Sequence, residues 1–345
     1  MNRLKIKRAD LDWENLPFGY IKTDYNVRYH YKDGKWSEGE ITSDETINLH
    51  IADPCIHYAQ QAFEGLKVFE TVDGRIVAFR PMENAIRFQH SCNKISIPPV
   101  PLDIFIESIK WVVSENNRFI PPYETGATLY VRPLIIGIGP QVGLGPAKEY
   151  IFTVFVSPVG PYYKGGFKPV RALVVEEYDR TAPKGVGDCK VGGNYAAGLV
   201  GSEYGKARGY PIVLYLDPKE KKYIDEFSTS NFIAISEDRY LTPHSETILQ
   251  SITNRSLATI AEDLGMSVEK RPIAIEEIDT FNEVGAVGTA AVITPISCIH
   301  YRGRDYDFPY DNDAGPVITR LYNRLTNIQR GEYEDRFGWL EEIEV

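Results

Sequence analysis

The sequence has few cysteines and histidines, and neither residue type is clustered. Its 345 residues include four cysteines, none in a C-x-x-C pair, and six dispersed histidines. This usage predicts reduced thiols, a cytoplasmic location and no metal site. No apolar run approaches the roughly 20 residues of a membrane helix, and the first ten residues lack the apolar segment of a signal peptide. A net charge of −10 argues against a nucleic-acid partner, whose phosphates would be repelled.

The sequence is long enough for two domains, and its apolar residues follow helix-like and strand-like patterns along most of the chain. Asp33-Gly34 and Asp73-Gly74 each separate two strand-like runs, which predicts two hairpins. Helical spacing or turn signals predict helices at 81–95, 103–116, 253–264, 275–281 and 315–329. Runs of apolar or β-branched residues predict strands at 127–138, 150–159, 170–176, 211–217, 222–224, 231–235 and 266–272, and on either side of Gly288.

This mixture of helices and strands predicts an α/β (α+β) chain in two parts. The stretch from Gly160 to Gly166 is rich in glycine and proline and has few groups to bury, which is typical of a domain boundary. We therefore expect a small N-terminal α/β domain over 1–160, an interdomain loop over 161–167 and a larger C-terminal domain over 168–345.

One lysine lies in an unusual setting, in the segment Asp188-Cys189-Lys190-Val191-Gly192-Gly193-Asn194-Tyr195. Two glycines without β-carbons let a backbone or a flat ligand approach the lysine stem, and Asn194 is expected to cap a helix that begins at Tyr195. An isolated K-x-G-G would favour a surface turn with a solvated lysine. The longer segment resembles the Schiff-base segment of branched-chain amino-acid aminotransferases, the pyridoxal-phosphate enzymes of fold type IV. The resemblance implies that Lys190 holds the cofactor and carries the proton transfers.

Such an enzyme also needs an acid for the pyridine nitrogen, an anion site for the phosphate and a donor for the ring hydroxyl. The segment 225–232 is similar to the E-x-x-T-x-N pattern of the family, which implies that Glu226 meets the ring nitrogen, with Thr229 beside it. Taken without the lysine segment, Glu226 is better interpreted as a solvated acid at a strand end. Tyr195, five residues after Lys190, has the family position for the ring-hydroxyl donor.

The phosphate has two candidate regions. Residues 249–255 precede an amphipathic helix, whose first N–H groups at Ile252 and Thr253 can point at an anion. A simple helix cap by Ser251 or Thr253 explains the same residues, and the family usually has Pro-Gly or Pro-Ser in place of Gln250-Ser251. Residues 288–291 resemble the family's G-T-A-A, and Arg80 in Phe-Arg-Pro resembles its phosphate arginine. The cofactor residues implied by the resemblance are Arg80, Lys190, Tyr195, Glu226, Thr229, Leu249, Ser251, Ile252, Thr253 and Thr289.

Three further segments resemble the family on the substrate side: H-Y…F-E-G at 57–65, Y-x-R-P at 130–133 and V-G-P-Y at 159–162. The resemblance implies that aromatic residues wall an apolar slot, that Arg132 serves the second carboxylate of glutamate and that residues of a second subunit close the slot. Each aromatic residue taken singly is more often part of a core. The implied substrate residues are Tyr58, Phe63, Gly65, Tyr130, Arg132, Leu144, Tyr162, Thr289 and Ala290.

Together these segments predict a branched-chain amino acid aminotransferase that exchanges L-leucine, L-isoleucine or L-valine with 2-oxoglutarate and glutamate. The resemblance also implies a homodimer with shared sites, and the net charge and the lack of a long apolar run predict neither a nucleic-acid nor a membrane partner. A D-amino-acid aminotransferase and an aminodeoxychorismate lyase share the fold, but the Y-x-R-P and V-G-P-Y segments argue against both. The alternative of an anion-binding module without covalent chemistry is less favoured, because it does not explain the spacing of Lys190, Tyr195 and Glu226.

Overall fold

The structure is a computed structural model, and it describes residues 6–162, 166–308, 310 and 313–345. Residues 163–165 of the expected interdomain loop lie outside the described residues. The chain divides into two compact units. The first consists of Met1–Tyr162, Lys190–Gly192 and Asn327–Val345, and the second of Tyr163–Cys189 and Gly193–Thr326. Lys190–Gly192 and Asn327–Val345 both belong to the first unit, although the expected C-terminal domain spans 168–345.

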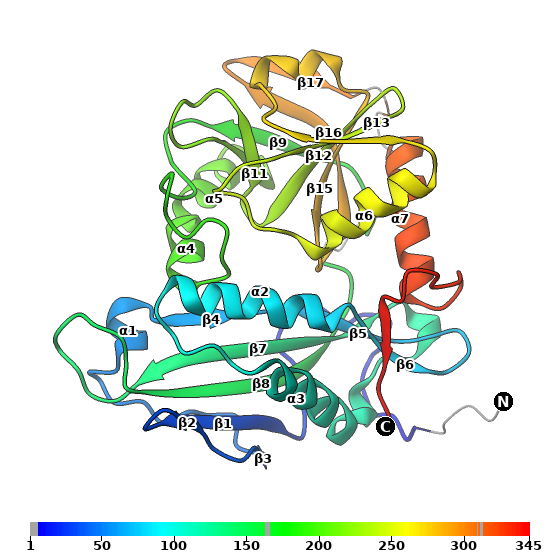
Figure 1. Cartoon of the computed structure of the whole chain (residues 1–345). Coiled ribbons are helices and arrows are strands. Elements are labelled where there is room, and N and C mark those ends of the chain that lie inside the picture. Colours follow the sequence, from blue (N-terminus) through cyan, green and yellow to red (C-terminus); the bar gives the residue numbers. More distant parts are fainter. Residues whose placement is uncertain (1–5, 163–165, 309, 311–312) are drawn as a thin grey trace. The chain divides into compact units, whose positions relative to one another are not determined.

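The first unit is built on an antiparallel sheet, drawn in the lower part of Figure 1. Its strands run in the order β18-β6-β5-β7-β8-β1-β2, with β3 paired to β1 and β4 paired to β7. Asn327–Val345 belongs to this unit because β18 pairs with β6. The bounds are β1 Asn26–Lys32, β2 Lys35–Trp36, β3 Glu40–Thr42, β4 Gln61–Phe63, β5 Leu66–Glu70, β6 Ile76–Phe79, β7 Thr128–Ile138, β8 Glu149–Val159 and β18 Leu340–Glu342.

Both predicted hairpins are confirmed. Lys32 pairs with Lys35 across the first turn, and Glu70 pairs with Ile76 across the second. The helices of this unit are α1 Pro54–Tyr58, α2 Pro81–Lys94 and α3 Leu102–Glu115, with short 3-10 turns at Asn117–Phe119 and Tyr123–Thr125.

Helices α2 and α3 pack on the same face of the sheet through three buried aromatic rings. The ring of Phe88 on α2 lies 5.4 Å from that of Phe105 on α3 and 5.6 Å from that of Phe152 on β8. The Phe105 and Phe152 rings are stacked at 6.0 Å. The helical spacing that predicted both helices therefore marks the faces that they bury.

The second unit is built on a mixed sheet in the order β11-β10-β9-β16-β15-β12-β13-β14, with β17 paired to β16. Strand β11 also pairs with β12, so the first six strands of this order close on themselves. The pairs β9–β10, β9–β16 and β13–β14 are parallel. The bounds are β9 Val170–Val175, β10 Ile212–Leu216, β11 Ile224–Phe227, β12 Ser230–Ser236, β13 Arg239–Pro243, β14 Ser267–Arg271, β15 Glu283–Gly288, β16 Val292–Tyr301 and β17 Arg304–Asp307.

The remaining helices are α4 Gly192–Ala197, α5 Leu199–Lys206, α6 Ile252–Asp263, the 3-10 helix Ile275–Thr280 and α7 Pro316–Gln329. The prediction that Asn194 caps a helix starting at Tyr195 is wrong. Helix α4 begins three residues earlier, at Gly192, and Asn194 is buried inside it. Among the described residues, no helix has both the length and the apolar character needed to cross a membrane.

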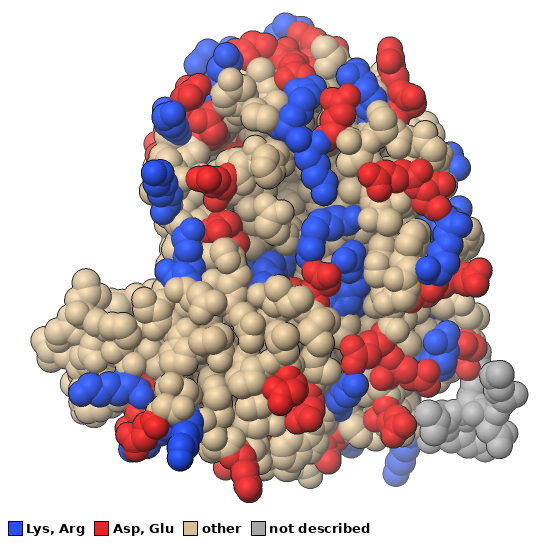
Figure 2. Space-filling model, viewed as in Figure 1, with Lys and Arg blue, Asp and Glu red and all other residues tan. Residues whose placement is uncertain are grey.

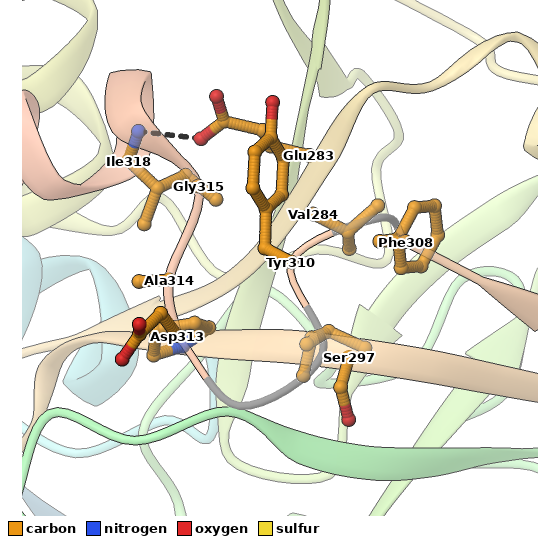
Figure 3. Close-up of a pocket in the computed structure, with 11 residues that line it drawn as sticks. Glu283, Val284, Ser297, Phe308, Tyr310, Asp313, Ala314, Gly315 and Ile318 are labelled. Atoms are coloured by element: carbon orange, nitrogen blue, oxygen red, sulfur yellow. Dashed lines mark hydrogen bonds between the residues drawn. The ribbon is translucent and has the colours of Figure 1, made fainter.

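The start of α7 is held by a carboxylate from the sheet (Figure 3). Buried Glu283 on β15 accepts hydrogen bonds from the backbone N–H groups of Val317 (3.0 Å) and Ile318 (2.7 Å). Pro316, the first residue of the helix, has no N–H to satisfy. Burial raises the pKa of Glu283 although both hydrogen bonds favour the ionised form. A small pocket beside this cap is lined by Val284, Ser297, Phe308, Tyr310, Asp313 and Ala314.

Candidate active site

The backbone of Lys190 is fixed on both sides by the first unit. Its N–H donates to the Ser91 hydroxyl on α2 at 3.0 Å, and its carbonyl accepts from the N–H of Phe63 at 3.0 Å. Val191 forms an isolated antiparallel bridge with Ala62. The lysine Nζ lies 4.9 Å from the centre of the Phe63 ring, within the range of a cation–π contact. The segment around Lys190 is therefore tied to strand β4 and helix α2.

Four of the expected substrate residues lie next to one another in the first unit. The Arg132 guanidinium is 5.1 Å from the Phe63 ring centre and 5.3 Å from that of Tyr130. Its Nη2 donates to the Tyr130 hydroxyl at 3.3 Å. A β-carbon at Gly65 would overlap that hydroxyl, so the tyrosine needs glycine there. One cation and two aromatic rings thus share one face of the sheet beside the Lys190 amine.

Tyr162, another expected substrate residue, is connected to this group by Phe18, a residue that the sequence analysis missed. The ring of Phe18 meets Tyr130 edge-on at 5.5 Å and Tyr162 at 5.0 Å. The chain before Phe18 is anchored because Pro17 accepts a backbone hydrogen bond from Gly160. Phe18 lies in an irregular segment before β1, where no periodic pattern distinguishes it from any other loop aromatic.

Tyr58 and Leu144 lie on an exposed end of the first unit. The Tyr58 hydroxyl donates to the Val142 carbonyl. Leu144 and Val142 are each 84 % exposed, and Ile51 is 83 % exposed. Figure 2 shows no Lys, Arg, Asp or Glu at the tip of this end, which carries α1 and the loop between β7 and β8. Apolar side chains this exposed commonly mark a surface that another molecule covers.

Arg80, the expected phosphate arginine, also lies in the first unit. It precedes α2 in a left-handed conformation with φ of 49°. Its N–H donates to the Trp339 carbonyl at 2.8 Å, and its guanidinium lies 5.1 Å from the Trp339 ring. Its Nη2 lies 3.4 Å from a Glu83 oxygen. The returning strand β18 therefore helps to orient this arginine.

Glu226 is the best-defined acid of the second unit. Its side chain is 3 % exposed. One oxygen, Oε1, accepts from Arg180 Nη2 at 2.9 Å and from the Leu249 N–H at 3.2 Å. The other, Oε2, accepts from Asn231 Nδ2 at 2.7 Å. Burial raises the pKa of Glu226 to about 7, against the lowering effect of Arg180. The group is a buried acid with three donors, which corrects the solvated-acid alternative.

The residues of one expected anion site lie at the start of α6. Ser251 caps the helix, and its side chain accepts from the Asn254 N–H at 3.2 Å. The N–H groups of Ile252 and Thr253 come first in the helix, so no helical carbonyl four residues earlier can accept from them. They can bind an anion with the helix dipole behind them. Leu249, two residues before Ser251, is bonded to Glu226, which brings the acid and the helix start together.

Two turns complete this end of the closed sheet. Thr229 lies between β11 and β12, and Thr289 and Ala290 follow β15 directly. The turns are neighbours because Asn231 on β12 pairs with Val287 on β15. A β-carbon at Gly288 would lie 3.8 Å from the Thr229 carbonyl. Tyr195 belongs to the second unit as well, half-buried in α4.

A family model described as amino-transferase class IV matches residues 61–299. The chain belongs to the class IV aminotransferase family.

Two bacterial relatives of this class IV aminotransferase are similar over nearly their full length. The branched-chain-amino-acid aminotransferase of Haemophilus influenzae is 46 % identical, with 97 % of this chain and 99 % of that protein covered. The enzyme of the same name from Helicobacter pylori is 43 % identical, with 97 % and 98 % covered.

Solved structures confirm the predicted fold class. The branched-chain amino acid aminotransferase of Escherichia coli matches with a TM-score of 0.78 at 24 % identity, over 94 % of this chain and 100 % of that one. A second branched-chain amino acid aminotransferase, solved with pyridoxamine 5′-phosphate, matches with a TM-score of 0.79, also at 24 % identity and with the same coverage.

Arg180 is a second residue of this aminotransferase that the sequence analysis missed. It is 6 % exposed, and besides Glu226 it bonds the carbonyls of Gly187 (3.1 Å) and Thr247. A β-carbon at Gly187 would overlap the Thr247 carbonyl, so a glycine is needed where the guanidinium joins the two loops. The polar segment around Arg180 gives no pattern that distinguishes a buried arginine from a solvated one.

Glu64 is a third missed residue, within the F-E-G segment that pointed to Phe63 and Gly65. It is fully buried and receives Arg87 Nε at 2.7 Å, Arg87 Nη2 at 2.9 Å and Asn84 Nδ2 at 2.8 Å. Burial alone would raise the pKa of Glu64, but Arg87, with a smaller contribution from Lys190, outweighs burial and lowers it. The residue therefore fixes the turn between β4 and β5 as an ionised carboxylate.

The Glu64–Arg87 pair leads to a prediction about stability. Glu64→Gln leaves the Arg87 guanidinium buried without its counter-ion, which costs about 3–5 kcal/mol of unfolding free energy. Adding Arg87→Met to Glu64→Gln should recover much of this loss. All four tryptophans (Trp13, Trp36, Trp111 and Trp339) lie in the first unit, so their fluorescence in a urea titration reports this unit selectively.

The same pair sets a pH dependence. Because the pKa of Glu64 is lower in the folded state, its stabilising contribution is complete above the unfolded pKa of about 4.3 and is lost as the pH falls through the folded value. The Glu64→Gln variant should lack this acid-side loss. Equal stability of the wild type and Glu64→Gln at neutral pH would contradict the assignment.

Proposed function

We propose that this protein is a branched-chain amino acid aminotransferase. It transfers the amino group of L-leucine, L-isoleucine or L-valine to 2-oxoglutarate, giving the branched 2-oxo acids and L-glutamate. The observation that carries the proposal is the Arg132 guanidinium, which is bonded to Tyr130 and lies over Phe63 beside the Lys190 amine. This arrangement offers an aliphatic side chain an apolar wall and offers a second carboxylate a cation. The two relatives above carry the name of this activity.

The donor set fits pyridoxal 5′-phosphate as the cofactor. The chain has a lysine amine for its aldehyde, a buried carboxylate with a pKa of about 7 for its ring nitrogen, and two helix-start N–H groups for its phosphate. Arg80, Thr229 and Thr289 would add charge and hydroxyl groups to the phosphate site. When bound, the cofactor withdraws electrons from the substrate α-carbon, which eases removal of the α-proton.

Each residue then has a defined task. The Lys190 amine would hold the cofactor and, as a free amine, would remove the proton at the substrate α-carbon as a base and return a proton as an acid. Glu226, whose three donors favour its ionised form against burial, would keep a proton on the ring nitrogen. Tyr195 donates a hydrogen bond to the ring hydroxyl. The backbone tie of Lys190 to Phe63 and Ser91 keeps the segment fixed while only the lysine side chain moves.

Substrate selection follows from the face that Tyr130 and Arg132 share. Phe63 and Tyr162 line the slot for an aliphatic side chain. The Ala290 N–H, with Thr289 and the Tyr130 hydroxyl, binds the α-carboxylate, which every substrate carries. Arg132 binds the second carboxylate of glutamate or 2-oxoglutarate, so one slot accepts both partners of the exchange.

We also propose a two-fold homodimer in which the exposed Tyr58 and Leu144 segment covers the slot of the partner subunit. Supporting this, the side chains of Ile51, Val142 and Leu144 form an apolar end on the first unit. A cytoplasmic location is supported by the cysteines, all four of which are buried free thiols.

The central test removes the lysine. Lys190→Ala should lose nearly all turnover and most of its labelling when pyridoxal 5′-phosphate and borohydride are added, because Lys190 is the amine proposed to hold the cofactor. Lys184→Ala, an exposed lysine six residues earlier, is the matched control and should be labelled and active. Peptide mass spectrometry locates the label. Near-normal turnover in Lys190→Ala would refute the assignment.

Turnover rates with L-leucine, D-alanine and aminodeoxychorismate, measured on one preparation, distinguish this activity from those of a D-amino-acid aminotransferase and an aminodeoxychorismate lyase. The proposal requires L-leucine to be fastest by a wide margin.

The dimer is tested by placing a charge on its covering loop. Leu144→Asp should raise the KM for leucine roughly tenfold, since an unpaired charge against an apolar slot costs on the order of 1–3 kcal/mol, with a smaller effect on glutamate. Leu199→Asp on α5, also exposed, is the control and should change neither KM. A fully active monomer in sedimentation, or equal effects on leucine and glutamate, would contradict the shared site.

A further inference from the structure

Inside the second unit, a chain of hydrogen bonds connects Glu226 to helix α6. The Tyr240 hydroxyl on β13 donates to Asn254 Oδ1 at 2.7 Å. Asn254 Nδ2 donates to Asn231 Oδ1 at 3.1 Å, and Asn231 Nδ2 donates to Glu226 Oε2 at 2.7 Å. All four side chains are buried. We call these four residues the relay.

The relay runs in one direction. An ionised carboxylate only accepts hydrogen bonds, so Asn231 must turn its amide nitrogen towards Glu226 and its oxygen towards Asn254. Asn254 is oriented in the same way, and its oxygen is left to accept from Tyr240. The remaining amide protons are also used, by the Leu249 carbonyl and the Thr242 hydroxyl. Each donor in the series therefore polarises the next towards the carboxylate.

The relay also joins two parts of the proposed cofactor site. Asn254 is the third residue of α6, and its own N–H bonds the Ser251 cap. The two N–H groups proposed for the phosphate directly precede it. Asn231 contacts Glu226 at its other end, so the distance between the helix start and the carboxylate is set by two rigid amide groups.

We propose that Asn254 and Asn231 are positioning residues that favour the ionised form of Glu226 and fix the spacing between its carboxylate and the start of α6. They touch neither substrate nor cofactor. The proposal rests on the proposed function, in which these two groups meet the ring nitrogen and the phosphate of one cofactor molecule.

Two other charged groups act on Glu226, and neither belongs to the relay. Arg180 faces Oε1, and Asp225 on the same strand raises the pKa of Glu226. Asp225 is itself bonded through both oxygens to the Thr247 hydroxyl at 2.8 Å. Substitutions of Asn231, Asn254 or Tyr240 therefore change the hydrogen bonding of the relay without adding or removing a charge.

The first test titrates Glu226 in the apoprotein by isotope-edited infrared spectroscopy, with Glu226→Gln identifying its carboxyl band. Asn254→Leu should raise the titration midpoint by about one pH unit, because Asn231, the donor to the charged carboxylate, loses the group that orients and polarises it. Tyr240→Phe, a smaller change, should raise it by a few tenths of a unit, as expected for the loss of polarisation from the far end. Tyr150→Phe removes a hydroxyl that is equally buried but lies in the first unit, and should leave the midpoint unchanged.

The second test measures spacing through ligand affinity. Asn254→Leu should weaken apoprotein binding of pyridoxal 5′-phosphate roughly tenfold but change binding of inorganic phosphate little, because only the cofactor spans both groups. A residue needed merely for folding would weaken both ligands in parallel.

The outcomes separate the two proposals. If Asn254→Leu and Tyr240→Phe titrate like Tyr150→Phe, the relay does not hold the charge and the inference is overturned. If both ligands weaken together, the spacing role is overturned. If Glu226→Gln leaves cofactor affinity unchanged, the proposed use of Glu226 fails, whatever the apoprotein titration shows.

Discussion

The buried carboxylate of Glu226 is the constraint on which the candidate site depends. Removing a carboxylate from water is costly unless every lone pair finds a donor. Here the donors come from three separate parts of the second unit: Arg180 before the lysine segment, Asn231 on β12 and the N–H of Leu249 before α6. Holding this one charge therefore aligns the end of the closed sheet with the start of α6.

Two buried glutamates show that the partners, rather than burial, decide the charge. Glu64 and Glu226 are both almost inaccessible to water. Glu64 receives two guanidinium nitrogens of Arg87, and its pKa is lowered. Burial raises the pKa of Glu226 to about 7, because the single nitrogen of Arg180 does not outweigh burial and Asp225 adds to the rise. The first is suited to a permanent structural charge, and the second to pairing with a protonated ring.

Local patterns predicted much of the fold, because hairpins, caps and amphipathic helices are set by neighbouring residues. Asp33-Gly34, Asp73-Gly74 and Ser251 lie where their turn and cap chemistry indicated. The long-range parts were not visible. The return of β18 to β6 depends on a pairing across most of the chain. Likewise, a family motif could identify Glu226. The positions of Arg180, Asn254 and Phe18 at the site depend on contacts between distant segments, which no local pattern predicts.

The most direct measurement is the protonation state of the cofactor's ring nitrogen. Nitrogen-15 NMR of the protein loaded with ring-labelled pyridoxal 5′-phosphate reports it independently of turnover. If Glu226 has the role proposed here, the nitrogen is protonated at neutral pH in the wild type and loses this proton in Glu226→Gln. An unprotonated nitrogen in the wild type, or the same signal in both proteins, would contradict the account.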